Sequence, residues 1–392
     1  MRPIANGSRY GQSGNLDYIR LFKSFEMKEH KTPSLNIYLT GGFLGSGKTT
    51  AIVNACKQLI KEDRRVAVIT NDQGDQQVDS GYLQGLLIPN AEVANGCFCC
   101  NYDALEEHIL RLRDSALPEI VFAESVGSCT DLVATIAKPF ALFHPEFRTV
   151  ISVFADASLL YSIIMGTSLF IEESVQYIYK KQLEEADVLI INKIDLLNED
   201  ETAAIKKLIE ESYPGKTTLL QDSFNEKDIN HWLKTLADFP VPPARASLAL
   251  DYDVYGEGEA ALAWLDQKVS IHTVMPLAVD EAINFAGFIY RKIKKAGYTI
   301  GHLKFLLSDD NWVEKISDTT SGQSDKPIYT GHSCKHLSLL INARVQTTPQ
   351  ILKQIISDAI LETMAGSTCR IVTEKENAFQ PGYPKPLHRI AE

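Results

Sequence analysis

The chain has 392 residues, of which 45% are hydrophobic and 23% charged. This length and this balance predict two or three globular domains with ample apolar material for a core. Lys and Arg together number 39 and Asp and Glu 50, so the formal net charge is −11. A dedicated nucleic-acid-binding protein needs a basic stripe, so we expect no nucleic-acid partner. No repeat, heptad run or polar tract dominates, which excludes collagen, coiled coils and wholesale disorder.

The sequence shows neither a membrane span nor a secretory signal. The most apolar segment, residues 149–171, is interrupted by Asp156, and the uncharged part that follows is shorter than the roughly 20 residues of a membrane-spanning helix. We expect a buried strand and a helix there. The N-terminus lacks the apolar core of a signal peptide. Seven cysteines, three of them within residues 97–100, do not resemble a disulfide framework, so we expect a cytoplasmic protein with reduced thiols and no membrane partner.

Residues 1–34 are polar and weakly patterned, and we expect them to form a flexible N-terminal extension. In residues 35–243, short apolar runs alternate with helix-length amphipathic segments. These runs are Leu35–Leu39, Val66–Ile69, Ile120–Ala123, Val150–Phe154, Val188–Ile191 and Leu219–Leu220. Such alternation predicts an α/β domain with a mostly parallel sheet, whose ligand lies at the carboxyl ends of the strands.

A second pattern follows the proline-rich segment 239–243. Strands are predicted at 260–273, 302–307, 312–316, 337–345 and 369–372, and helices at 279–293 and 349–360. The β-α-β-β-α-β order favours a smaller α+β domain of the ferredoxin-like type over residues 251–375. Residues 376–392 are expected to form an extended tail.

The first chemical motif lies in residues 42–49, which fit G-x-x-x-x-G-K-[ST] between a strand and a helix. Backbone N–H groups of such a P-loop cradle phosphates, and the helix N-terminus adds partial positive charge. Lys48 is expected to reach the β and γ phosphates, and the Thr49 hydroxyl to ligate Mg²⁺. The residues expected to hold the nucleotide here are Gly42, Gly45, Ser46, Gly47, Lys48, Thr49 and Thr50.

A second motif, Asn192–Asp195, follows the run 188–191 and concerns the base. The Asp195 carboxylate can accept both N1–H and the exocyclic amine of guanine, whereas adenine presents an acceptor at N1. Asn192 can brace the loop, and the stem of Lys193 can lie over the base. GTP is therefore favoured over ATP, with Ser223 as a weaker candidate for a contact to the base.

Two acidic residues end strands on the phosphate side. Asp72 and Glu124 are expected to face the γ-phosphate and Mg²⁺, with Asp72 as a Mg²⁺ ligand, and Gly127 can offer a backbone N–H to the γ-phosphate. A carboxylate beside Mg²⁺ can hold a metal-bound water or orient the attacking one. We expect Lys48, Glu124 and Asp72 to form the catalytic set.

Cysteines supply the third motif. Cys97, Cys99 and Cys100 can present three thiolates to one soft ion such as Zn²⁺ or Cu(I). Cys56 shares a helix face with apolar residues and is expected in the core, while Cys129 either approaches the nucleotide or packs in the interior. The alternating residues His332, Cys334 and His336 are expected to be a polar loop entering a strand, with an auxiliary metal site as the alternative.

Together these motifs resemble the CobW-type metallochaperone GTPases, whose relatives HypB and UreG serve hydrogenase and urease maturation. The resemblance rests on Gly42–Thr49, Asn71–Asp75, Gly96–Cys100, Glu124–Gly127 and Asn192–Asp195, and it covers residues 35 to about 240. Asp251–Glu259 and Trp264–Leu265 look like the start of that family's C-terminal domain. Asp72 and Asp75 stand where the CobW group usually has Glu, which leaves open which acid ligates Mg²⁺. The His-rich stretch of some members is absent.

The resemblance implies a GTPase that binds metal at the three cysteines and delivers it to, or activates, a client metalloprotein. The expected ligands are GTP, Mg²⁺ and a transition metal, with Zn²⁺ ahead of Co²⁺ and Fe²⁺. A nucleotide-dependent homodimer is compatible with this interpretation. Two alternatives remain open: a regulatory GTPase without metal transfer, and a metal-binding or storage protein in which GTP only sets the conformation.

Overall fold

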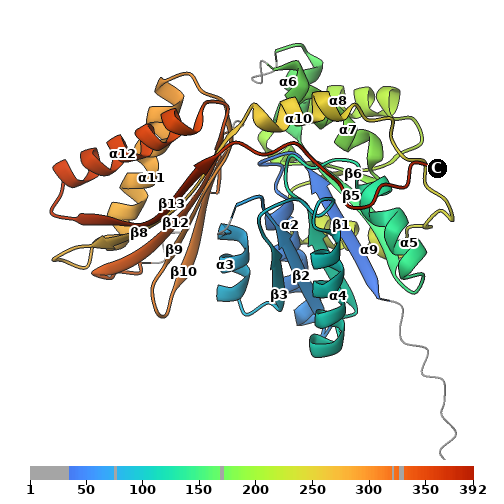
Figure 1. Cartoon of the computed structure of the whole chain (residues 1–392), viewed down its shortest axis with the longest axis horizontal. Coiled ribbons are helices and arrows are strands. Elements are labelled where there is room, and N and C mark those ends of the chain that lie inside the picture. The colour runs from blue at the N-terminus through green and yellow to red at the C-terminus, as the bar shows by residue number, and fades with distance from the viewer. Residues whose placement is uncertain (1–34, 75–76, 168–171, 320–321, 326–330) are drawn as a thin grey trace, which may run out of the picture. The chain divides into compact units, whose positions relative to one another are not determined.

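The apolar runs of the first half of the chain form the predicted parallel sheet (Figure 1). The computed structural model describes residues 35–392 apart from 75–76, 168–171, 320–321 and 326–330, so the predicted extension 1–34 lies outside the described residues. The strand order is β3-β2-β4-β1-β5-β6-β7, and each neighbouring pair is parallel. The strands are β1 (Asn36–Gly42), β2 (Val66–Asn71), β3 (Asn90–Val93), β4 (Ile120–Glu124), β5 (Arg148–Asp156), β6 (Val188–Asn192) and β7 (Thr217–Gln221).

Helices cover both faces of this sheet, which explains why the central strands are apolar throughout rather than alternating. On one face, α2 and α9 pack around Trp232, which is fully buried. On the other face, α4 and α7 contribute to a second apolar cluster. The helices of this part are α2 (Lys48–Lys61), α3 (Val78–Gly85), α4 (Tyr102–Ala116), η1 (Val133–Ala137), α5 (Lys138–Phe143), α6 (Ala157–Ile164), α7 (Glu173–Glu185), η2 (Ile194–Leu196), α8 (Glu199–Ser212) and α9 (Glu226–Asp238).

The order of the strands reverses at β1, which has β4 on one side and β5 on the other. Ligands of open parallel sheets bind in the crevice at such a switch point, outside the carboxyl ends of the strands. The loop 43–47 that follows β1 lies at this position and leads directly into α2.

The second sheet is antiparallel and has the order β11-β10-β9-β12-β8-β13. The part β9-β12-β8-β13, with α11 after β8 and α12 before β13, is the predicted ferredoxin-like arrangement, and the β10–β11 hairpin extends it at one edge. Its elements are β8 (Ala263–His272), α11 (Ala278–Lys295), β9 (Ile300–Ser308), β10 (Val313–Thr319), β11 (Gly322–Asp325), β12 (His336–Val345), α12 (Pro349–Ala365) and β13 (Arg370–Phe379). The strand predicted from residue 260 begins at Ala263, because α10 (Tyr252–Ala260) precedes it.

The two faces of the second sheet differ in chemistry. Side chains of alternate residues point to opposite faces of a strand, and Leu303, Phe305 and Leu307 of β9 join the apolar cluster under α11 and α12. The other face is polar and meets the first sheet's carboxyl edge. There Arg344 is fully buried, with Nη2 2.7 Å from Asp72 Oδ1 and Nη1 2.8 Å from Asp266 Oδ1.

After β13 the chain returns toward the first sheet without further helix or strand. The Leu387 N–H donates to Cys99 O (2.9 Å), and the Ile390 N–H donates to Ala134 O (2.9 Å). Residues 35–392 form one compact unit, so the domain limits predicted at 243, 251 and 375 stay predictions.

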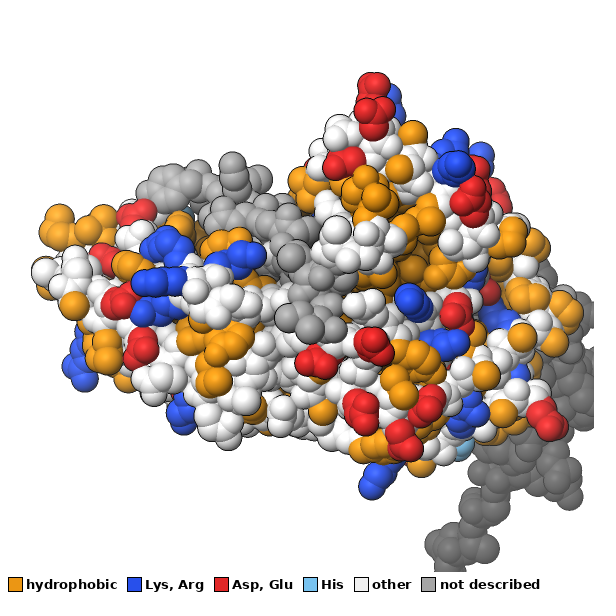
Figure 2. Space-filling model, turned by 90° about the horizontal axis from the view of Figure 1, so that it is seen from above, with side chains coloured by type: hydrophobic (Ala, Val, Ile, Leu, Met, Phe, Trp, Pro, Cys, Tyr) orange, Lys and Arg blue, Asp and Glu red, His pale blue; other side chains and the backbone are white. Residues whose placement is uncertain are grey.

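Figure 2 shows charged side chains of both signs scattered among hydrophobic ones on the face that it views. Within the described residues, every helix is too short or too polar to cross a bilayer.

Candidate nucleotide and metal sites

The loop after β1 has the backbone that a phosphate-binding loop requires. Gly42 has φ 126°, and a Cβ there would lie 2.2 Å from Phe154 O of the neighbouring strand. Gly47 has φ 91°, and a Cβ there would lie 2.2 Å from Asn192 Nδ2. Only glycine adopts both the conformation and the close approach without strain. The loop therefore places the N-terminus of α2 against an open pocket.

This pocket brings together most of the residues predicted to hold a nucleotide. Those that line it are Gly45, Gly47, Lys48, Thr49, Thr50, Asp72, Glu124, Gly127, Asn192, Lys193 and Asp195. Gly42, the last residue of β1, and Ser46 of the loop are not among the lining residues. The empty space in and above the pocket, its open mouth included, is about 930 Å³.

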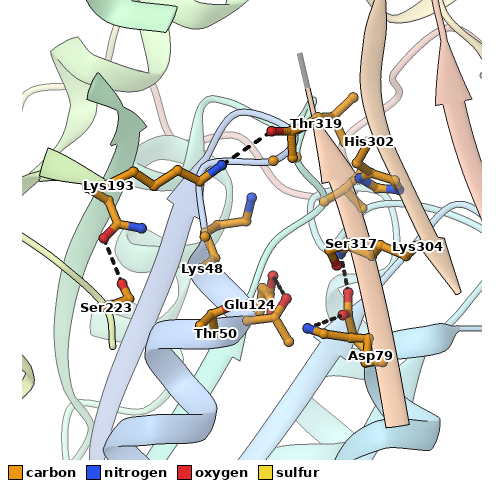
Figure 3. Close-up of a pocket in the computed structure, with 18 of the residues that line it drawn as sticks. Lys48, Thr50, Asp79, Glu124, Lys193, Ser223, His302, Lys304, Ser317 and Thr319 are labelled. Atoms are coloured by element: carbon orange, nitrogen blue, oxygen red, sulfur yellow. Dashed lines mark hydrogen bonds and ion pairs between the residues drawn. The ribbon is translucent and has the colours of Figure 1, made fainter. Parts of the chain in front are cut away.

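Lys48 lies at the centre of the pocket (Figure 3). Its Nζ donates to Gly42 O (2.6 Å) and to Phe43 O (3.2 Å), so it is folded back onto the loop. Burial lowers the pKa of Lys48 to about 8. A bound phosphate would place negative charge beside the Lys48 ammonium group. Its oxygens would also accept stronger hydrogen bonds from that group than the two carbonyl oxygens do.

Thr49 and Glu124 form a pair beside Lys48. Thr49 Oγ1 donates to Glu124 Oε1 (2.8 Å), and Glu124 Oε2 is buried without a hydrogen-bond partner among the described residues. Burial and the nearby Asp79 carboxylate raise the pKa of Glu124. A hydroxyl and a buried carboxylate with an unused oxygen are hard ligands of the kind that Mg²⁺ prefers, so the donor set fits this ion.

Asp72 lies at the pocket but is engaged elsewhere. Its Oδ1 accepts from Arg344 Nη2 (2.7 Å) and from the Gly74 N–H (3.0 Å). The structure thus pairs Asp72 with a cation of the second sheet, which the sequence analysis did not anticipate, and its assignment as a Mg²⁺ ligand stays a prediction. Asp75 lies outside the described residues. Gly127 lies close to the loop, since a Cβ there would lie 2.6 Å from Leu44 Cδ2, and its contact with the γ-phosphate stays a prediction.

The opposite end of the pocket holds the second motif. Asn192 Nδ2 donates to Ser46 O (2.8 Å), and Asn192 Oδ1 accepts from Ser223 Oγ (2.7 Å), so Asn192 braces the loop. Lys193 Nζ lies 2.9 Å from Asp156 Oδ2. Burial, together with the Asp222 carboxylate, raises the pKa of Asp195.

Several lining residues lie outside the motifs that predict the nucleotide site. Asp222 and Phe224 flank the predicted Ser223, and their position after β7 was a usable signal. The second sheet adds His302, Lys304, Lys315, Ser317 and Thr319. No local motif marks these residues, because only the packing of the two sheets brings them to the pocket.

The three cysteines converge in the loop that leads into α4. The Sγ atoms of Cys97 and Cys99 are 2.6 Å apart, those of Cys97 and Cys100 are 3.3 Å apart, and those of Cys99 and Cys100 are 3.8 Å apart. Cys97 and Cys99 are buried, whereas Cys100 is partly exposed and accepts from the Lys385 N–H of the C-terminal tail (3.3 Å). Three sulfurs this close to one another can serve as ligands of a single soft ion.

Two other cysteines have the interior positions that packing favours. Cys129 is fully buried, with Sγ 4.0 Å from Cys99 Sγ, so it lies at the cysteine cluster rather than at the nucleotide pocket. Cys56 lies in the core under α2, and burial raises its pKa to about 12.

The alternating residues near position 334 do not share a face. His336 Nδ1 lies 2.7 Å from His272 Nδ1 on the adjacent strand β8. His332 Nε2 lies 2.6 Å from Asp309 Oδ2, and the ligand atoms of Asp309, His332 and Cys334 lie within 4.8 Å of one another. The expected polar loop entering a strand is what the structure shows, since β12 begins only at His336. For the alternative, an auxiliary metal site, Asp309 stands in the place that His336 had in the prediction.

Comparison with known proteins agrees with this geometry. Residues 36–221 match the family model described as CobW/HypB/UreG, nucleotide-binding domain. These residues form a CobW/HypB/UreG nucleotide-binding domain. The matched range of this CobW-type domain begins with β1 and ends with β7, so it contains the P-loop, the cysteine loop and the Asn192–Asp195 motif.

Curated relatives match a similar part of the chain. The zinc chaperone CobW of Sinorhizobium sp is 24% identical over 207 residues, which are 46% of this chain and 56% of that protein. The zinc-regulated GTPase metalloprotein activator 1 of Dictyostelium discoideum is 27% identical over 247 residues, 52% of this chain and 49% of that protein. The chain thus spans about half the length of the curated relatives it matches.

Two solved structures are similar to this chain at low identity. HypB from Helicobacter pylori in complex with nickel has 16% identity and a TM-score of 0.41, over 54% of this chain and 93% of that chain. Zn(II)-bound YjiA GTPase from E. coli has 14% identity and a TM-score of 0.35, over 83% and 98% of the two chains. Both similarities are too low for a comparison of individual residues.

Proposed function

We propose that the protein is a GTP-hydrolysing metallochaperone that binds a transition metal, zinc first, at Cys97, Cys99 and Cys100 and passes it to, or activates, a client metalloprotein. The observation that carries the proposal is the position of Asn71, which lines the nucleotide pocket and also holds the cysteine loop. Asn71 Nδ2 donates to Gly96 O (2.7 Å), and Asn71 Oδ1 accepts from the Phe98 N–H (2.8 Å). One side chain therefore contacts both sites.

A second connection supports the same coupling. Glu124 and Gly127 line the nucleotide pocket, and Cys129, two residues further, lies against the cysteine cluster. Between them, Ser128 Oγ donates to Glu259 Oε1 (2.7 Å). A displacement of this short segment by the γ-phosphate would be transmitted to the thiols. The names of the relatives, zinc chaperone and zinc-regulated activator, support zinc as the metal.

Hydrolysis in this pocket is mainly a matter of positioning and electrostatics. The loop amides and Lys48 bind the phosphates, and Asn192 keeps the loop in place. Mg²⁺, when bound, would neutralise charge on the β and γ phosphates, and Thr49 and Glu124 are the residues that would hold it. The unused Oε2 of Glu124 can also accept from a water and orient it toward the γ-phosphate.

The proposal predicts that zinc and GTP bind with positive linkage. We expect zinc to bind about 5–150-fold more tightly in the presence of a non-hydrolysable GTP analogue than in the presence of GDP, since allosteric couplings are typically about 1–3 kcal/mol. Reciprocity requires zinc to raise the affinity for the analogue by the same factor. Isothermal titration calorimetry of the wild-type chain measures both quantities.

Asn71→Ala is expected to reduce this coupling, whereas Asn90→Ala on the neighbouring strand β3 removes an amide that does not line the pocket and should retain it. Equal zinc affinity with the analogue and with GDP in the wild type would exclude the coupled chaperone and favour a regulatory GTPase. Coupling without turnover would instead indicate a binding or storage protein.

Base selectivity gives a separate prediction. Asp195→Asn should weaken GTP binding and favour xanthosine triphosphate, whose C2 carbonyl accepts a hydrogen bond where guanine's amine donates one. Losing one paired polar contact typically reduces affinity by about 1–3 kcal/mol, or roughly 5–150-fold. Competition binding of the two nucleotides measures the exchange. Unchanged GTP affinity would show that Asp195 does not read the base.

A further inference from the structure

One wall of the nucleotide pocket belongs to the second sheet. Leu303 and Phe305 of β9 pack under the helices. The alternate residues of the strand, His302 and Lys304, therefore point to the opposite face, where they line the pocket. The first sheet's loop contacts this wall directly, since a Cβ at Gly45 would lie 2.7 Å from Thr319 Cγ2 of β10. The two sheets thus enclose the pocket between them.

His302 has a buried ring nitrogen without a hydrogen-bond partner among the residues that the structure describes. The side chain is 4% exposed, and its Nε2 makes no hydrogen bond within the described part of the chain. Burial and the nearby Lys304 hold the pKa of His302 well below its usual range, so the ring is neutral and one of its nitrogens carries a proton. A buried polar atom without a partner is costly, and in a pocket a ligand, a water or an ion can satisfy it.

Lys304 and Lys315 add an excess of positive charge to the same wall. Lys304 Nζ forms an ion pair with Asp79 Oδ2 on α3, and Lys315 Nζ lies 3.7 Å from Asp79 Oδ1. The single carboxylate of Asp79 is thus paired with the ammonium groups of both lysines. Burial acts against the charge on Lys304, but Asp79 and Glu124 outweigh it and raise its pKa. The wall is therefore suited to a further anion.

The order of groups along the pocket identifies that anion. In Figure 3, Lys193 and Ser223 lie on one side of Lys48, and His302 and Lys304 lie on the other. A nucleotide whose base contacts the Asn192–Asp195 motif and whose β-phosphate contacts Lys48 would direct its third phosphate toward β9.

We propose that His302 and Lys304 bind the terminal phosphate of a nucleoside triphosphate, so that the second sheet completes the nucleotide site and distinguishes a triphosphate from a diphosphate. This inference rests on the proposed function, which supplies GTP as the ligand. Asp79 pairs with Lys304, so the third phosphate would compete with this carboxylate for the Lys304 ammonium group.

Binding of the third phosphate also has a consequence for α3. This helix is attached to the second sheet through Asp79 and through its first residue, since the Val78 N–H donates to Asn342 Oδ1 (2.8 Å). Exchange of Asp79 for a phosphate at Lys304 loosens one of these attachments. Asn71, which holds the cysteine loop, is the last residue of β2, the strand before α3 in the chain.

The test compares the affinities of a non-hydrolysable GTP analogue and of GDP in Lys304→Met. We expect the affinity for the analogue to fall about 10–150-fold, as for loss of a charge-assisted hydrogen bond, while the affinity for GDP changes by less than about twofold. His302→Leu should lower the ratio of analogue affinity to GDP affinity in the same direction. Lys304→Arg, which keeps the positive charge, should retain the wild-type ratio. The control is Lys268→Met on β8, a partly exposed lysine paired with Glu374, which should alter neither affinity.

Lys304→Met leaves Asp79 buried without its main partner, so Lys304→Met with Asp79→Asn is the companion variant that removes both charges. This double variant should fold and still lose the preference for the triphosphate. An unchanged ratio of the two affinities, or an equal loss for both nucleotides, would overturn the inference alone. A wild-type chain that binds neither nucleotide would instead overturn the proposed function.

Discussion

Lys48→Ala is expected to abolish GTP hydrolysis while leaving the fold intact. Lys48 Nζ contacts two loop carbonyls and forms no ion pair with the residues that the structure describes, so its loss leaves none of their carboxylates without an ion-pair partner. The same ammonium group is the cation closest to the β and γ phosphates in the proposed complex. Removing a single preorganised hydrogen-bond donor that stabilises developing negative charge typically lowers turnover by about 10²–10³-fold. Phosphate release under single-turnover conditions measures the effect.

The matched control is Lys57→Ala on the same helix, where the side chain is exposed. It changes the net charge and the helix composition in the same way but should leave hydrolysis at the wild-type rate. A Lys48 variant that hydrolyses GTP as fast as the Lys57 variant would contradict the P-loop assignment, provided that both unfold at the same temperature as the wild type.

Replacing Cys97, Cys99 and Cys100 together with Ser is expected to remove one zinc ion per chain and the zinc dependence of GTP binding. Zinc bound by thiolates and imidazoles in small domains contributes roughly 10–16 kcal/mol at pH 7, so loss of all three ligands should leave essentially no affinity at this position. In the wild type, zinc affinity should rise with pH, because thiols must lose their protons to bind the ion. Competition with a chromophoric chelator measures the stoichiometry and the affinity.

Cys56→Ala is the control for the loss of a thiol, since Cys56 is buried in the core under α2, apart from the cluster. It should bind zinc as the wild type does. If the triple variant keeps its full zinc content, the cysteine cluster is not the metal site, and Asp309, His332 and Cys334 are the next residues to replace.

Local patterns were sufficient for much of this molecule. The P-loop and the apolar strands of the parallel sheet follow from a few consecutive residues, because glycine conformations and apolar runs are properties of short segments. The convergence of Cys97, Cys99 and Cys100 has the same origin, since three residues within one loop stay close in any compact conformation. The contact of Asn192 with Ser46, 146 positions away, was predictable because both motifs follow strands of one parallel sheet, whose carboxyl ends meet at the same edge.

Contacts between distant parts of the chain were not accessible in this way. Asp72 pairs with Arg344, 272 positions further along the chain, and no local pattern predicts this contact. Asp309 rather than His336 completes the cluster around His332, and His302 and Lys304 form a wall of the nucleotide pocket. Each of these outcomes depends on the register of β9 and β12 and on how the second sheet packs against the first. Register and packing are set by the sum of many weak burial terms over the whole chain, and a shift of one residue would reverse which side chains face the pocket.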